Sequence, residues 1–125
     1  MINTPELRVG NWVYDGTRTQ FPMFIDTVGN GFAYLDFDDN ECGPWEADPA
    51  NLEGIPITRE ILSNSEFDNL GWCFPHEELG LRLIEQDWGW EFLCVTIPIG
   101  KPIHFVHELQ NVFYDLTKKE LKIKL

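Results

Sequence analysis

Four side chains that can bind zinc occur as two pairs, Cys73-x-x-His76 and His104-x-x-His107. A structural zinc site takes four Cys or His ligands, so the two pairs match the number required. Against this, Phe74-Pro75 lies inside the first pair, and the second pair is expected to straddle the end of a strand and the start of a helix. We therefore expect no metal site, with Cys73 as a small buried apolar side chain and His107 bonded to backbone groups at the helix start.

The same residues leave a small thiol enzyme or hydrolase open as an alternative function, with Cys73 acting beside His76 or His107. A nucleophilic cysteine needs surroundings that favour its thiolate, and nothing in the sequence indicates such surroundings. Ser63 and Ser65, the only serines, stand in no nucleophile motif, and no glycine-rich phosphate loop is present. We assign no catalytic residue, expect no cofactor and favour a non-enzymatic function.

Acidic residues gather in the stretch 36–51, DFDDNECGPWEADPAN, and no Lys or Arg occurs from Thr19 to Thr58. The stretch begins like a calcium loop, but Glu41 replaces the required sixth-position Gly and Ala47 the twelfth-position Glu, so no calcium site is expected. It is either a solvated acidic loop or a docking surface for a basic protein partner. The candidate interaction residues are Asp36, Asp38, Asp39, Glu41, Trp45, Glu46 and Asp48.

The 125 residues carry a net charge of −12, and the lysines gather near the C-terminal end as Lys118, Lys119, Lys122 and Lys124. Binding to nucleic-acid phosphates needs clustered basic residues on a surface, so nucleic acid is not expected as a partner. Acidic mimicry of DNA, in which the carboxylates occupy the site of a nucleic-acid-binding protein, is a further alternative. A homo-oligomer is also compatible with the sequence.

The sequence indicates a cytoplasmic protein without a membrane partner. No apolar run approaches the length of a membrane span, and the start MINTPELRVG lacks the basic and apolar regions of a signal peptide. Three cysteines, Cys42, Cys73 and Cys94, are too widely spaced to form a disulfide framework, which is consistent with a reducing compartment.

Alternating apolar residues and turn signals predict a β-rich first half. Asp15-Gly16 and Gly29-Asn30-Gly31 are turn signals, and Gly10 indicates a bend in the first strand. The strands are expected to be short and joined by turns, which favours a small bent antiparallel sheet or partial barrel. They cover 7–14, 21–28, 32–37 and 52–57.

The second half is expected to mix helices with a β-hairpin. Thr58 is a good N-cap for a helix that places Ile61 and Leu62 inward, with Phe67 and Leu70 continuing the same contact. The segments 80–85 and 90–97 predict the hairpin. Its two tryptophans, Trp88 and Trp90, either stack on a ligand or pack on the sheet, and we favour packing.

A final helix within 104–121 is expected to organise the fold. Leu109, Val112, Phe113 and Leu116 recur at the spacing of one buried face, whereas Gln110 and Asp115 are expected to meet water. Thr117 with Glu120 matches a capping box that would start a further turn, and 122–125 alternates like a last strand. The whole predicts one compact α+β domain over 1–125, with a β-rich lobe at 1–57 and an α+β lobe at 58–125.

Three segments carry a resemblance to known proteins: LRVGNWVYD (7–15), IPITREIL (55–62) and FVHELQNVFYDLTKKEL (105–121). They resemble short uncharacterised proteins of Bacteroides-type bacteria and their phages or prophages. The chain departs from that pattern at Lys118, where Gly is usual, and at Val112, where Leu is usual, and 63–103 matches nothing in it. The resemblance implies a shared fold and a bacterial or phage origin, and no site residues. Separately from the resemblance, the lack of catalytic, cofactor and nucleic-acid signals and the acidic stretch around Trp45 favour a protein-interaction module.

Overall fold

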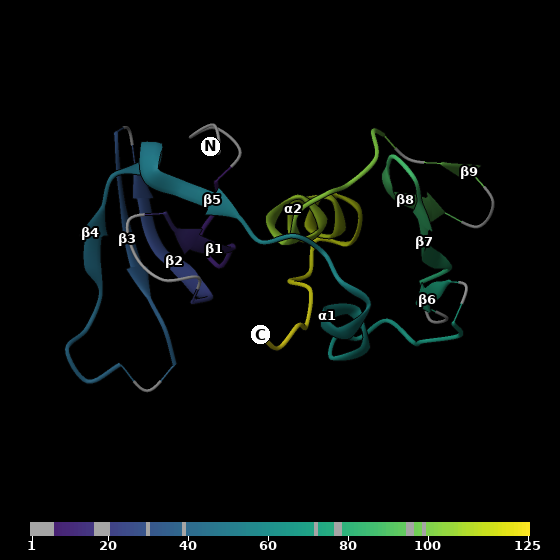
Figure 1. The fold of residues 1–125 in the computed structure, drawn as a ribbon, viewed down its shortest axis with the longest axis horizontal. Coiled ribbons are helices and arrows are strands. Elements are labelled where there is room, and N and C mark those ends of the chain that lie inside the picture. Colours follow the sequence, from purple (N-terminus) through teal and green to yellow (C-terminus); the bar gives the residue numbers. More distant parts are fainter. Residues whose placement is uncertain are drawn as a thin grey trace.

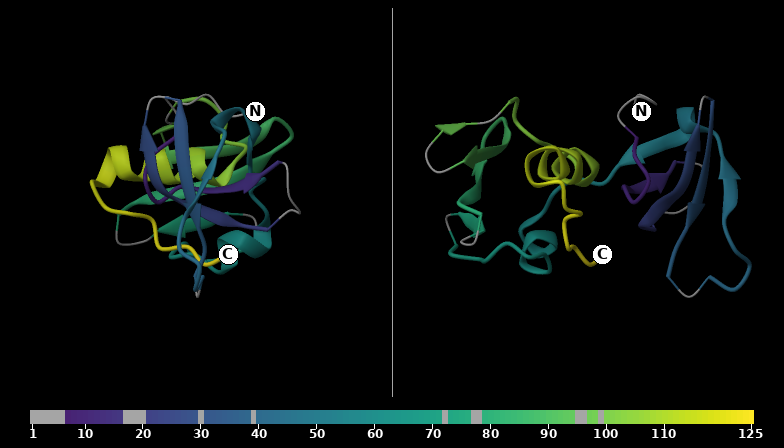
Figure 2. Two further views of the ribbon diagram at one scale, coloured as in Figure 1. Left: turned by 90° about the vertical axis from the view of Figure 1, so that its left-hand side faces the viewer. Right: turned by 180° about the vertical axis from the view of Figure 1, so that it is seen from behind.

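The computed structural model describes residues 7–16, 21–29, 31–38, 40–71, 73–76, 79–94, 97–98 and 100–125. It is a mixed α+β structure in which helix α2 (Val106–Thr117) lies between two antiparallel sheets (Figure 1, Figure 2). The predicted α+β class is therefore confirmed. None of the helices in the described ranges has the length and apolar character needed to cross a lipid bilayer.

The first sheet is antiparallel throughout and has the strand order β4-β3-β2-β1-β5. Its strands are β1 (Trp12–Asp15), β2 (Met23–Gly29), β3 (Phe32–Asp36), β4 (Trp45–Ala47) and β5 (Leu52–Gly54). A short 3-10 helix, Pro49–Asn51, connects β4 to β5. These two strands are the edges of the sheet and do not pair with each other, so the sheet is not a closed barrel.

One face of the first sheet forms a core of its own. Alternate residues of its strands point to this face, as the two-residue period of a strand requires, and no residue of α2 or the second sheet belongs to the cluster. The strands of this sheet are bent and twisted across one another (Figure 2). The buried members are Leu7, Val13, Met23, Ile25, Ala33, Leu35, Ala47 and Leu52.

The middle strands predicted at 21–28 and 32–37 are confirmed by β2 and β3. The first strand begins later than predicted, at Trp12. Gly10 has a φ of +93°, which glycine adopts without steric cost, and its N–H donates to the carbonyl of Ile25 at 2.8 Å. The chain therefore turns onto β2 before the regular pairing of β1 starts.

The second sheet contains β6 (Phe74–His76), β7 (Leu81–Gln86), β8 (Gly89–Cys94) and β9 (Ile97–Pro98), antiparallel in that order. The predicted hairpin is confirmed by β7 and β8. Helix α1 (Arg59–Ser63) begins where predicted, because the Thr58 hydroxyl accepts a hydrogen bond from the Ile61 N–H at 3.1 Å.

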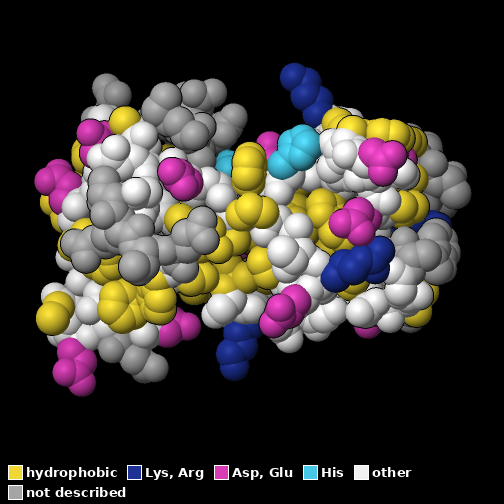
Figure 3. Space-filling model, viewed as in Figure 1, with side chains coloured by type: hydrophobic (Ala, Val, Ile, Leu, Met, Phe, Trp, Pro, Cys, Tyr) yellow, Lys and Arg dark blue, Asp and Glu magenta, His cyan; other side chains and the backbone are white. Residues whose placement is uncertain are grey.

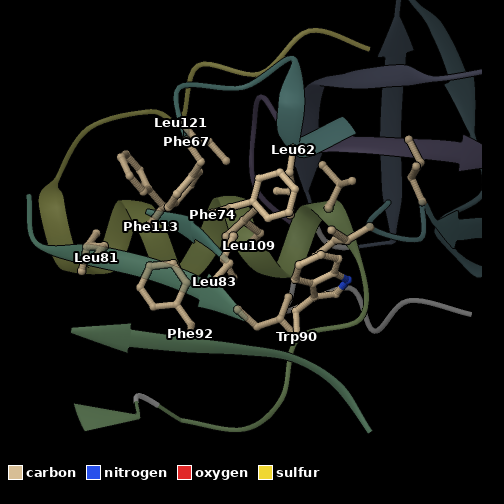
Figure 4. Close-up of a cluster of buried hydrophobic side chains, with 14 residues drawn as sticks. Leu62, Phe67, Phe74, Leu81, Leu83, Trp90, Phe92, Leu109, Phe113 and Leu121 are labelled. Atoms are coloured by element: carbon tan, nitrogen blue, oxygen red, sulfur yellow. The ribbon is translucent and has the colours of Figure 1, made fainter. Parts of the chain in front are cut away.

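The larger core lies between α2, α1 and the second sheet (Figure 4). Leu109 and Phe113 of α2 are 0% and 1% exposed, as predicted for the inner face of the last helix. The ring of Phe67 lies 6.1 Å from that of Phe113 and 6.4 Å from that of Phe92, both edge-on. Full burial of each such side chain contributes roughly 1.5–3 kcal/mol to stability.

Three predictions about buried residues are wrong. Leu116 is 45% exposed, because the core ends at Phe113 and does not reach the last turn of α2. Leu70, in the segment after α1, is 59% exposed. Gln110, predicted to meet water, is 2% exposed because a second layer covers this side of the helix. Val112 is half-buried at the margin of the core.

The end of α2 also differs from the prediction. The Thr117 hydroxyl donates back to the carbonyl of Phe113 at 2.8 Å and accepts from the Lys119 N–H at 3.1 Å, but no helical turn follows Thr117. Lys118 ends the helix in the left-handed conformation, with φ 60°. The last residues form an isolated bridge between Ile123 and Ser65 and not the predicted strand.

The polar side of α2 is bonded to the segment that leads into β1. Gln110 Oε1 accepts a hydrogen bond from the Trp12 N–H at 2.9 Å, and Gln110 Nε2 donates to the Gly10 carbonyl at 3.0 Å. Asn11 is fully buried and donates to Asn111 Oδ1 at 2.9 Å. Buried polar groups need such partners, so these bonds fix how the first sheet sits on the helix.

Arg8 completes this arrangement, which we term the α2–β1 joint. Its Nε donates to Asn111 Oδ1 at 3.2 Å, its guanidinium is paired with Glu120, and it lies 4.4 Å from the ring centroid of Tyr114. The joint comprises Arg8, Asn11, Trp12, Gln110, Asn111, Tyr114 and Glu120. All of them belong to the segments 7–15 and 105–121, so the two ends of the chain meet at this joint.

Candidate functional site

The stretch predicted as a polar acidic loop is partly a strand. Trp45–Ala47 pairs with β3, with Leu35 opposite Trp45 and Tyr34 opposite Glu46. Since side chains alternate along a strand, Glu46 lies on the opposite face from Trp45 and beside the exposed Tyr34. The structure therefore separates two of the residues that the sequence placed in one interaction site.

The remaining carboxylates of the stretch fall into two groups. Asp36 accepts hydrogen bonds from the Phe37 N–H and from Asn40 Nδ2, both at 2.8 Å, and Asp48 caps the 3-10 helix through the Ala50 N–H at 3.0 Å. These two carboxylates hold the local backbone. Asp38 and Glu41, in contrast, are exposed and make no ion pair with any residue that the structure describes. Asp39 lies outside the described residues.

Three aromatic rings form a ladder beside this loop. Trp45 is half-buried against the first core, its ring centroid lies 5.8 Å from that of Phe37, and the ring of Phe37 lies 5.4 Å from that of Phe21. Phe21 is 50% exposed at the outer end of the ladder. Sequence reasoning did not single out Phe21 or Phe37, because the contact joins segments from three different parts of the chain.

We term Phe21, Phe37, Trp45, Asp38 and Glu41 the acidic aromatic surface. Figure 3 shows hydrophobic side chains gathered on the lower part of the first lobe, with acidic side chains at the margin. No Lys or Arg occurs between Thr19 and Thr58, so this part of the chain carries negative charge without a local counter-charge. An exposed ring beside unpaired carboxylates can bind a cationic or basic segment.

The Cys and His side chains predicted as alternatives do not converge. Cys73 is 2% exposed, and His107 is 1% exposed, with its ring stacked 5.9 Å from that of Phe105. His104 is exposed, and His76 Nε2 lies 3.1 Å from Glu66 Oε1. In the described ranges no three His, Cys, Asp or Glu side chains are grouped to hold one metal ion. A buried Cys73 also gives no support to thiol chemistry.

A cavity that sequence reasoning missed lies around this His76–Glu66 pair. It has a volume of about 230 Å³ and is lined by Glu66, His76, Leu79, Phe113, Lys119, Glu120 and Lys122. Its carboxylates already have partners: Glu66 has His76 and the Lys122 N–H, and Glu120 has Arg8. These contacts hold the chain after α2 in place, so we assign the pair a structural role.

A second, more open hollow lies at the turn between β7 and β8. It has a volume of about 390 Å³ and is lined by Ile57, Glu85, Gln86, Asp87, Trp88, Gly89, Trp90 and His104. Trp90 is 4% exposed and packs in the core, as predicted, but Trp88 is 57% exposed and does not pack on the sheet. The sequence placed both tryptophans at the hairpin but did not distinguish their environments.

The chain was compared with protein-family models, with curated proteins and with solved structures, and none of them matches.

Proposed function

We propose that this protein is a non-enzymatic interaction module that docks a basic protein segment on the acidic aromatic surface. The ring ladder carries the proposal, because Phe21 is 50% exposed at its outer end and its neighbour Phe37 is followed in the chain by the exposed carboxylates Asp38 and Glu41. Aromatic side chains are enriched at protein interfaces, where they give a large contact area. A cytoplasmic protein of bacterial or phage origin is part of the same proposal.

The charge of the chain favours a basic partner. A net charge of −12 attracts positively charged proteins over several ångströms and raises their association rate. Each exposed ion pair at Asp38 or Glu41 would add only about 0.2–1 kcal/mol. The affinity must therefore come mainly from contact with Phe21 and Phe37, while the carboxylates select a basic segment and speed its arrival.

The test uses two double variants with the same change of charge. Asp38→Asn with Glu41→Gln alters the proposed surface, and Glu60→Gln with Asp115→Asn alters exposed carboxylates elsewhere. Proteins captured from host extracts would be quantified by mass spectrometry on the parent, on both double variants and on Phe21→Ala. We expect a basic protein that the parent and the control variant retain, and that the surface variant and Phe21→Ala lose.

Two outcomes would overturn the proposal. One is equal capture by all four proteins, which would place the contact elsewhere, and the other is a captured partner that is itself acidic. If the partner binds nucleic acid and duplex DNA displaces it, the result would favour acidic mimicry of DNA on the same surface.

A further inference from the structure

Trp88 lies exposed at the hollow of the β7–β8 turn, and the fold gives no structural reason for a tryptophan at this position. Trp88 is 57% exposed and makes no ring–ring or cation–ring contact with another residue in the described ranges. It occupies a turn position, between the paired Gln86 and Gly89, where small polar residues are usual. Neither packing nor backbone conformation requires a tryptophan here.

The groups around Trp88 suit a positive charge. Tryptophan is the side chain whose ring face attracts cations most strongly. Asp87, its neighbour, is exposed and makes no ion pair with a described residue, whereas Glu85 is already paired with Arg59 at 3.1 Å. The net charge of −12 further favours cations near this surface.

The opposite wall of the hollow is held in place by backbone bonds. The N–H and carbonyl of Trp90 are bonded to the carbonyl and N–H of Ile103, at 2.8 and 2.7 Å. This pairing brings His104 over Gly89, where a Cβ would come within 2.7 Å of the His104 ring. Only glycine lets His104 lie this close to the turn, and Gly89 and His104 both line the hollow, which has a volume of about 390 Å³.

We propose that this hollow binds an organic cation, either a quaternary ammonium compound or the side chain of an arginine or lysine, with the Trp88 ring as its contact face and Asp87 as its counter-charge. The proposal does not depend on docking at the acidic aromatic surface, which belongs to the other lobe. A quaternary ammonium compound and a basic side chain would both bind through their positive charge. Titrations with choline and with arginine or lysine distinguish the two.

The test titrates the full chain with choline, with free arginine and with free lysine. Binding is followed by NMR at the indole N–H of Trp88 and at the backbone amide of Gly89, which remains observable in Trp88→Ala. A neutral control is 3,3-dimethylbutan-1-ol, which has the shape of choline with carbon in place of nitrogen. The variants are Trp88→Ala and Asp87→Asn, matched by Phe32→Ala and Asp115→Asn, which remove an exposed ring and an exposed carboxylate elsewhere.

We expect at least one cation to shift the Trp88 signal and the neutral control to shift it far less. Trp88→Ala should weaken binding about tenfold or more and Asp87→Asn roughly fivefold, while the two matched variants leave it unchanged. Binding of choline alone would indicate a small-molecule ligand, and binding of arginine or lysine alone would indicate a protein side chain. Equal binding of the neutral control, no binding at all, or full binding by Trp88→Ala would overturn the proposal.

Discussion

The two sides of α2 are stabilised in different ways. Toward the second sheet, Leu109 and Phe113 are buried among mainly aromatic and aliphatic side chains. Toward the first sheet, Gln110 is equally buried but is satisfied by two hydrogen bonds to backbone groups of Gly10 and Trp12. One helix thus serves as the wall of an apolar core and as the polar contact surface for another lobe.

The two kinds of contact differ in how strictly they fix the orientation of the elements that they join. Apolar burial is strong but tolerates small shifts, because it depends on area removed from water. Hydrogen bonds at Gln110 and Asn111 require particular distances and angles, so they select one orientation of the first sheet on the helix. The apolar side should therefore supply most of the stability, and the polar side should set the geometry that places the two candidate surfaces relative to each other.

The largest effect is expected on the apolar side. Phe113→Ala removes a ring that is 1% exposed and contacts Phe67, and should lower the free energy of unfolding by roughly 3–5 kcal/mol. Total stability of a domain is typically about 5–15 kcal/mol, so this variant should unfold at a much lower urea concentration. An unchanged midpoint in urea would show that this side of α2 is not the main core.

On the polar side, Gln110→Ala removes the partner of the Trp12 N–H and of the Gly10 carbonyl, both of which are part-buried. A fully buried group left without its partner costs about 1–3 kcal/mol, so two such groups would cost about 2–6 kcal/mol; because these two are only part-buried, we expect a loss of roughly 2–4 kcal/mol. Asp115→Ala, on the exposed side of the same helix, is the control and should change stability by less than about 0.5 kcal/mol. Equal midpoints for the two variants would contradict a structural role of the joint.

A gain in stability is expected from a substitution at the end of α2. Lys118 has φ 60°, a conformation that costs about 1–2 kcal/mol for residues with a Cβ and almost nothing for glycine. Lys118→Gly should therefore raise the free energy of unfolding by roughly 1 kcal/mol. The neighbouring Lys119 has an ordinary φ, so Lys119→Gly should be neutral or destabilising in the same thermal denaturation series.

The smallest effect is expected at Leu116, which shares the sequence spacing of the buried residues but is 45% exposed. Leu116→Gln should change stability by no more than about 0.5 kcal/mol. A loss comparable with that of Phe113→Ala in chemical denaturation would mean that a covering layer is present over the last turn of α2.

The sequence predicted the elements better than the contacts between lobes. Periodicity located α2 from a helical spacing of apolar residues, and β2, β3 and the β7–β8 hairpin from their alternation, because both patterns are local in the sequence. It placed Gln110 in water, since an amide on a helix signals solvent unless a second layer is known to lie there. The position of that layer depends on pairings of Gly10 and Trp12 with residues about 100 positions away, which local patterns do not encode.

The same reason limited the prediction of the candidate sites. The acidic stretch was evident from composition, but the ring ladder of Phe21, Phe37 and Trp45 forms only when β3 and β4 pair. Likewise, Trp88 and Trp90 are two residues apart in a hairpin, and one is exposed while the other is buried. The turn and the bridge to Ile103 decide this difference; the sequence predicted the hairpin turn but not the bridge.

The most direct test of the two-sided account is amide hydrogen exchange at Trp12, whose N–H is held by a side chain of α2 at 2.9 Å. In the parent this amide should exchange slowly, and in Gln110→Ala it should exchange far faster. The Ile103 amide, bonded to the Trp90 carbonyl at 2.7 Å in the second lobe, is the internal reference and should stay protected in both. A Trp12 amide that exchanges rapidly in the parent, or equally slowly in the two proteins, would contradict the account.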